Sequence, residues 1–176
     1  MINKKKLSIV LAFICILIGA VFSACTGDTE QPPAGHTDEP AMRETLAEAD
    51  IRGAVNAIYA SLENYKVRML NPFEVNEYYG IGAEDIAEFT AFRSDPREGI
   101  CDIMIIQPVS GSADRVRACL YAYQSDRITE FVNYNILSSY EIAQNAVVYD
   151  QGEYIIMLMF KDNEAVRAII DDYIPQ

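Results

Sequence analysis

The spacing of hydrophobic positions changes several times along the chain, and each change predicts a different element. Residues 7–22 form an apolar run without a charge, whereas residues 26–41 contain no large apolar side chain. From residue 43 to about residue 65, apolar side chains recur mostly every three or four positions, which is typical of an amphipathic helix. Beyond residue 88, short apolar segments between turn residues predict β-strands.

Two strand–strand–helix units account for most of the second half of the chain. Four strands are expected at residues 88–93, 100–108, 146–150 and 153–160. Each pair of strands leads into a helix, and Ser112 and Asp162 stand where the N-caps of these two helices would lie. Residues 133–145 between the units are expected to hold a loop and a short helix.

These units predict an α+β fold with a four-stranded antiparallel sheet packed by helices and preceded by an N-terminal helix. The second strand of each pair is the more continuously apolar, so both are expected at the centre of the sheet, in the order 1-2-4-3. Helices would cover one face. The units also align at an offset of 50 residues, which suggests an internal repeat: Ile106, Val116 and Tyr123 then fall on Ile156, Val166 and Tyr173.

The first 25 residues have the organisation of a secretory signal. Three lysines at positions 4–6 precede the apolar run, which is shorter than the roughly 20 residues that span a bilayer. Ser23 and Ala24 then precede Cys25, as in a bacterial lipoprotein signal, where the cysteine receives a diacylglycerol and becomes the N-terminus. Phe22 replaces the Leu that usually stands at its position. An uncleaved membrane helix and plain secretion are the alternatives.

We therefore expect three regions: a signal peptide at residues 1–24, a flexible acidic tether at residues 25–41 and a single domain at residues 42–176. The lipid on Cys25 would hold the protein in the outer leaflet of the cell membrane, facing the extracytoplasmic space. His36 is the one histidine of the chain and lies in the tether. It has no rigid surroundings there that could make it a catalytic residue or a metal ligand.

Charge limits the partners of the protein. The chain has a formal net charge of −12, and loss of the three N-terminal lysines would leave 11 basic against 26 acidic residues, about −15. A protein this acidic is repelled by nucleic acid, which is therefore an unfavoured partner.

Of the four cysteines, only Cys101 and Cys119 belong to the predicted domain. They could form a disulfide or remain two buried thiols, and their spacing predicts no metal site.

Carboxylates are the remaining candidates for catalysis, because the histidine in the tether excludes Ser–His and Cys–His pairs. The candidates are Glu84, Asp85, Glu88 and Asp102. Asp102 lies in a strand expected at the centre, where burial could raise its pKa and suit it to acid–base chemistry. The alternative, which we favour, is a carboxylate that is solvated or paired with an arginine such as Arg93 or Arg97.

Tyrosines and methionines supply the candidates for a binding surface. Tyrosine suits such surfaces because it is both apolar and polar. The tyrosines expected in irregular segments, and so on a ligand or partner surface, are Tyr78, Tyr79, Tyr134 and Tyr140. Three methionines share the two central strands: Met104, Met157 and Met159. They belong to the core if the first helix covers their face of the sheet, and form an apolar docking patch if that face is uncovered.

The segment NAVVYDQGEYIIMLMFKDNEAVRAIIDDY at residues 145–173 carries a resemblance. With the helix and the acidic linker before it, the chain resembles a family of short Gram-positive lipoproteins, clostridial in type, that contain a domain of unknown function. The similarity covers roughly residues 45–173. It implies an envelope location and a fold, and it brings no catalytic motif.

Together these observations predict a membrane-tethered lipoprotein that acts as a non-enzymatic binding module, without a cofactor or metal. Its partners would be the membrane, through the lipid on Cys25, and an envelope protein or small ligand. The alternative is a cell-envelope enzyme that uses carboxylates on glycan or peptide. That alternative predicts a cleft in which at least two of the four candidate carboxylates converge.

Overall fold

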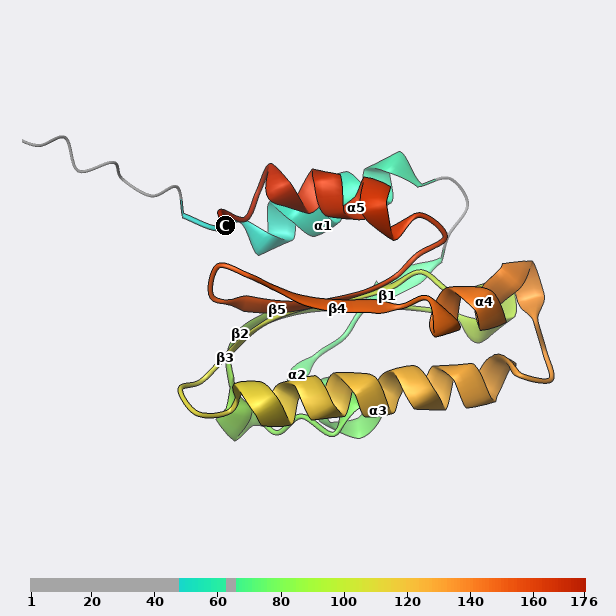
Figure 1. Ribbon diagram of the computed structural model, residues 1–176, viewed down its shortest axis with the longest axis horizontal. Helices are drawn as coiled ribbons and strands as arrows, with labels where there is room; N and C mark the ends of the chain where they lie inside the picture. Colours follow the sequence, from blue (N-terminus) through green and yellow to red (C-terminus); the bar gives the residue numbers. More distant parts are fainter. Residues whose placement is uncertain (1–47, 63–65) are drawn as a thin grey trace, which may run out of the picture. The chain divides into compact units, whose positions relative to one another are not determined.

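A five-stranded antiparallel sheet lies between two layers of helices (Figure 1). The computed structural model describes residues 48–62 and 66–176. Within these residues the strands are β1 (Val67–Met69), β2 (Ile86–Ser94), β3 (Asp102–Pro108), β4 (Val147–Gln151) and β5 (Tyr154–Met159). The helices are α1 (Ile51–Ser61), α2 (Pro72–Tyr79), α3 (Ala113–Phe131), α4 (Ser139–Gln144) and α5 (Asn163–Asp171). Short 3₁₀ turns occupy Ala83–Asp85, Pro96–Glu98 and Ile136–Ser138.

The prediction of a four-stranded sheet is wrong, because β1 adds a fifth strand at the outer edge of β2. The strand order is β1-β2-β3-β5-β4. Val67, Arg68 and Met69 pair with Ser94, Arg93 and Phe92. A strand of three residues that is mostly exposed has too few positions to show alternation, so periodicity does not reveal it. The four longer strands lie side by side as β2-β3-β5-β4.

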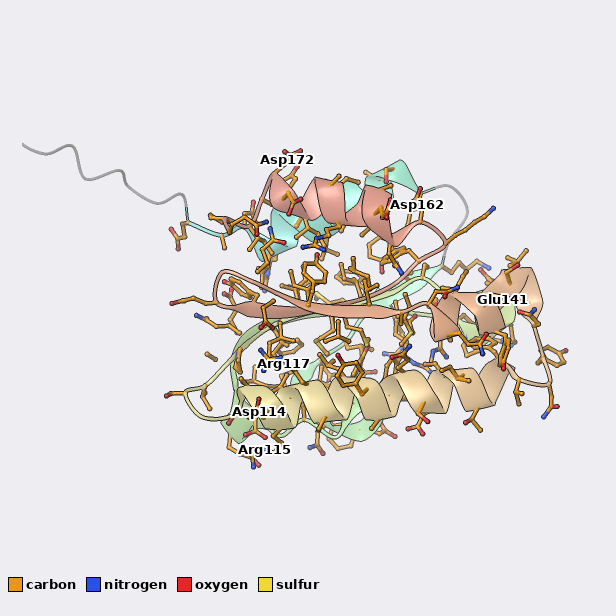
Figure 2. The ribbon with its side chains drawn as sticks, viewed as in Figure 1. Asp114, Arg115, Arg117, Glu141, Asp162 and Asp172 are labelled. Carbon is orange, nitrogen blue, oxygen red and sulfur yellow. The ribbon has the colours of Figure 1, made fainter. Side chains whose placement is uncertain are left out.

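We had expected helices on one face of the sheet, but helices cover both faces. On one face α1 and α5 pack over Ile103 and Ile105, and on the other α2, α3 and α4 pack over Met104 and Ile106. Side chains fill the space between the sheet and each helical layer (Figure 2). A strand covered on both faces is apolar at every position, which explains the continuous hydrophobic runs of β3 and β5.

The three methionines of the central strands therefore belong to the core. Met104, Met157 and Met159 are fully buried on the face covered by α2, α3 and α4. This confirms one of the two alternatives and excludes an exposed docking patch at these residues. The cover comes mainly from α3, which follows β3 directly in sequence, and not from the N-terminal helix.

The helix ends reflect local capping chemistry. Helix α1 begins later than expected, at Ile51, where the Asp50 carboxylate accepts a hydrogen bond of 2.7 Å from the amide of Gly53. The rest of the predicted segment, 43–47 and 63–65, lies outside the described residues. Asp162 caps α5 as predicted, by accepting from the amide of Ala165 (Figure 2). Ser112 makes no capping bond to α3; its hydroxyl donates to Asp85 and accepts from Arg115.

Helix α2 was not anticipated, because residues 73–85 carry no clear helical period. Its start is nonetheless encoded by a capping box, in which Asn71 and Glu74 accept hydrogen bonds from each other's backbone amides. Pro72 occupies the first helical position, where a missing amide proton costs nothing. Gly80 ends the helix with φ +69°, a left-handed conformation that glycine adopts without strain.

The two strand–strand–helix units do not form a structural repeat. If the two units were a repeat, the two-fold axis relating β3 to the antiparallel β5 would be normal to the sheet. Such an axis would place α3 and α5 on the same face. Instead α3 places Val116 in the core on one face, and α5 places Val166 in the core on the other. The offset of 50 residues therefore reflects two units of like composition and opposite hand.

Candidate functional site

Asp102 is the centre of a buried polar network at the start of β3. Its side chain is fully enclosed and accepts hydrogen bonds from the Ser94 amide at 2.8 Å and the Ser94 hydroxyl at 2.6 Å. The Tyr123 hydroxyl donates to the second carboxylate oxygen at 2.7 Å. Arg127 lies 3.0 Å from that same oxygen and completes an ion pair.

Arg127 reaches this carboxylate from the fourth turn of α3 and is itself only 1% exposed. Burial would lower the pKa of its guanidinium, but the nearby Asp102, Tyr123 and Glu130 outweigh that effect and hold the pKa above its usual value. Arg127 also donates a hydrogen bond through Nη1 to Glu130, at 2.5 Å. The Phe131 ring lies 4.9 Å from the guanidinium carbon and covers it.

Two stacked tyrosines close the network on the side of α2. The rings of Tyr79 and Tyr123 are 3.9 Å apart and nearly parallel. Burial, followed by the charge of Asp102, raises the pKa of both phenols. Their hydroxyls therefore stay protonated at any physiological pH, and Tyr123 remains a donor to the carboxylate.

This arrangement makes Asp102 a structural residue. The carboxylate has an ion pair and three hydrogen bonds, and no part of its side chain reaches solvent. The expectation of an arginine partner was therefore right in kind and wrong in identity. Arg97 pairs with Asp95 on the surface, and Arg93 contacts the network through the Tyr123 hydroxyl, at 3.2 Å, and through Glu130, at 3.6 Å, but not Asp102 itself.

The four candidate carboxylates do not converge. Glu88 pairs with Gln107 at one end of β3 and Asp102 lies at the other end, roughly 17 Å apart for a strand rise of about 3.4 Å per residue. The Glu88 carboxylate accepts from the Tyr154 hydroxyl, and Glu84 is exposed. The buried Asp85 accepts from Ser112 at 2.7 Å and from Arg115, which extends from the first turn of α3 (Figure 2). No hydrogen bond or ion pair among the described residues brings two of these four carboxylates to a shared partner.

The four tyrosines proposed as surface candidates lie in different environments. Tyr79 is only 2% exposed and belongs to the core. Tyr134 is 67% exposed at the end of α3, and the half-buried Tyr140 on α4 accepts a hydrogen bond from Gln144. Tyr78, on α2, is half-buried beneath two arginines. Only Tyr78 forms part of a site with several functional groups.

Arg68 on β1 and Arg93 on β2 lie over the ring of Tyr78 at the open edge of the sheet. Their guanidinium carbons are 5.7 Å and 4.6 Å from the ring centre. The two arginines are direct cross-strand partners. Arg68 donates to Glu74 and to the Tyr78 hydroxyl, and Arg93 donates through Nε to Tyr123.

A pocket of about 330 Å³ opens beside this arginine pair. Seven residues of β1, β2 and the following turn line it: Lys66, Val67, Arg68, Arg93, Ser94, Asp95 and Pro96. We refer to it as the arginine pocket. Three of the seven are cations, and Ser94 links the floor of the pocket to Asp102 through its hydroxyl.

Sequence reasoning missed Arg68 and Lys66, because the strand that carries them was missed. In the sequence these cations form only two local pairs, Lys66 with Arg68 and Arg93 with Arg97, and the pairing of β1 with β2 brings the two pairs together. Ten lysines and arginines lie between residues 48 and 176, and half of them are found at this corner of the domain: Lys66, Arg68, Arg93, Arg97 and Arg127. In so acidic a chain, those two local pairs of cations were the available signal.

Other predicted features can be placed as well. Cys101 and Cys119 are free thiols, and burial raises the pKa of Cys101 to about 12. Among residues 48–62 and 66–176, no group of three His, Cys, Asp or Glu side chains could hold a metal ion. Within the same residues, no helix combines the length and apolar character needed to cross a bilayer. Cys25 and His36 lie outside the described part of the chain.

Comparison with known proteins gives one match. The model of a family described as "Domain of unknown function (DUF4358)" matches residues 60–160, which is more than half of the chain. The match spans β1 to β5 and includes the arginine pocket and the Asp102 network. No curated protein and no solved structure matches the chain.

Proposed function

The chain belongs to the DUF4358 family of domains of unknown function, and from this premise we propose that it is a lipid-tethered extracytoplasmic binding module. In this proposal the protein is a Gram-positive lipoprotein, held in the outer leaflet of the cell membrane by a diacylglycerol on Cys25. The domain beyond the tether binds a ligand or an envelope partner and performs no catalysis.

The arginine pocket is the observation that carries the binding function. It gathers cations at an open sheet edge of a domain that is otherwise strongly acidic. Binding sites combine a concave surface with a few convergent polar groups, and this pocket has both. The buried ionisable groups beside it are held in structural contacts: Asp102 by Arg127, and the two tyrosines by their stacking.

The sequence before the domain supports the tethering. Two acyl chains anchor a protein stably where one is marginal, and the lipid on a lipoprotein cysteine supplies two. The basic residues, the apolar run and the small residues before Cys25 have the order that such processing requires.

Replacement of the lipidated cysteine tests the tether. Cys25→Ser should abolish incorporation of radiolabelled fatty acid and either release the protein from the membrane fraction or leave an uncleaved precursor. Cys15→Ser is the matched control, because it removes the other cysteine of the N-terminal segment and should leave labelling unchanged. A wild-type chain that incorporates no labelled fatty acid would refute the lipoprotein assignment.

A further inference from the structure

We propose that Arg68 and Arg93 together bind an oxyanion, a phosphate or carboxylate group, in the arginine pocket. This inference names the ligand class of the binding module proposed above and rests on that proposal. It concerns the exposed end of the polar network, where cationic side chains meet solvent, and not the enclosed Asp102.

The first support is the pairing of two like charges. Arg68 and Arg93 are directly opposite each other on antiparallel strands, an arrangement that destabilises a strand pair when both residues carry the same charge. The negative face of the Tyr78 ring attracts both guanidinium groups and keeps them together. An anion bound by both arginines would offset their remaining repulsion.

The second support is that Arg93 has donors to spare. Its Nε donates to Tyr123, but among the described residues neither of its terminal nitrogens makes a hydrogen bond. Arg93 forms a long ion pair with Glu130, at 3.6 Å from one terminal nitrogen, and Arg127 engages the same carboxylate more closely, at 2.5 Å. One terminal nitrogen of Arg93 is thus in a long ion pair and the other makes no polar contact among the described residues, so the guanidinium can still turn donors toward the oxygens of phosphate or carboxylate.

The third support is that the surrounding charges leave room for an anion. Asp95 lines the pocket, but hydrogen bonds from Arg97 hold the pKa of Asp95 well below its usual range and compensate its charge. Lys66 is 79% exposed and pairs with Glu98. Arg68 is half-exposed and pairs with Glu74. Glu74 is thus the group that an incoming anion would compete with.

Titration of the full chain in a neutral detergent with inorganic phosphate, and separately with acetate, tests the proposal by calorimetry. Wild type should bind at least one of the two saturably and more weakly as salt rises. Arg93→Gln and Arg68→Gln should each weaken binding about tenfold or more, because a charge-assisted hydrogen bond is lost. Arg68→Gln guards against misfolding, since this side chain lies on an exposed edge strand.

Arg167→Gln is the matched control. Arg167 also lies over a tyrosine ring, 4.3 Å from the centre of Tyr149, but it belongs to α5 on the opposite face of the sheet. Its replacement should leave phosphate and acetate binding unchanged. Equal weakening by Arg167→Gln and Arg93→Gln would mean that the anion responds to overall charge, and would overturn the proposal.

Glu74→Gln should raise the affinity for the anion, a change that a structural defect cannot imitate. Gln keeps an oxygen that can accept the hydrogen bond from the Asn71 amide, so the cap of α2 is retained. The loss of its charge frees Arg68 for the ligand. Phosphate or acetate should therefore bind severalfold more tightly to Glu74→Gln than to wild type, and unchanged or weaker binding would contradict the role assigned to Arg68.

A binding experiment with lipid vesicles distinguishes phosphate in lipid headgroups from soluble or polymer-borne phosphate. Binding to phosphatidylglycerol vesicles over phosphatidylcholine vesicles, lost in Arg93→Gln, would assign the site to lipid headgroups. Phosphate binding without any preference for the anionic vesicles would assign it to soluble or polymer-borne phosphate. Absence of saturable binding of phosphate, acetate and anionic vesicles would overturn the inference, while fatty-acid labelling of Cys25 would leave the tether intact.

Discussion

The polar network around Asp102 illustrates what a buried charge requires. Removing a carboxylate from water is costly, and the cost is offset only when the charge is both paired and hydrogen-bonded. Arg127 supplies the pairing, while Ser94 and Tyr123 supply the hydrogen bonds. The network ties the end of β2 and the start of β3 to α3, and it carries Arg93 at its exposed end through the Tyr123 hydroxyl.

Replacement of Asp102 by Asn should therefore destabilise the domain. The amide cannot neutralise Arg127, which stays buried, and loss of one partner of such a pair costs about 3–5 kcal/mol. Chemical denaturation would measure the change. Asp126→Asn, on the exposed side of the same helix, should change the free energy of unfolding by no more than about 0.5 kcal/mol. An Asp102→Asn protein as stable as wild type would show that the ion pair contributes little.

Among the elements, α2 holds the two arginines of the arginine pocket in place, through Tyr78 and Glu74. This helix of eight residues begins in the capping box of Asn71 and Glu74 and ends at Gly80. It presents Tyr78 to the arginines and Tyr79 to the core, so that one short helix serves both the binding surface and the buried network. Glu74 has two roles, because it caps the helix and also pairs with Arg68.

Asn71→Ala should loosen this helix. Loss of the side-chain acceptor at the N-cap costs about 1 kcal/mol in typical cases, and the helix is too short to be stable without its cap. Thermal unfolding would detect the loss as a lowered Tm. The matched variant Asn56→Ala lies on the exposed face of α1 and should be neutral or slightly stabilising, since Ala favours a helix interior. Equal effects of the two variants would mean that the cap has no special role.

The predictable parts of the fold are those with a long hydrophobic period. Strands β2 to β5, α3 and α5 have it, and their positions followed from sequence within a few residues. Strand β1 and α2 do not, because one is three residues long and the other is defined by its ends. The candidate site depends on these two elements. Tyr78 was predicted as part of a binding surface, whereas Arg68 and Arg93 were not.

Our failure to predict helices on the second face of the sheet has a related cause. Continuous apolar strands indicate burial on both faces, and we had used that pattern only to place β3 and β5 at the centre. Which arginine reaches Asp102 could not be read from sequence either, because Arg127 is 25 positions away and depends on how α3 crosses the sheet. Contacts of this kind follow from packing and not from local pattern.

In the proposed molecule, a lipid tether carries a domain whose surface has one distinctive charge feature. The chain carries a net charge of −12, and the arginine pocket is the place where its described domain concentrates cations. A strongly acidic surface repels most anions and polyanions, so an anion that does bind is directed to this pocket. The acidity of the molecule would thus contribute to selectivity as well as to solubility.

An oxyanion bound between Arg68 and Arg93 should alter the NMR signals of both arginine side chains. In NMR spectra of the full chain that resolve the Nε–Hε groups, phosphate or acetate should shift the signals of Arg68 and Arg93 saturably. The signal of Arg167, which also lies over a tyrosine ring, should stay in place. Signals of Arg68 and Arg93 that do not move, or that move no more than that of Arg167, would contradict the account.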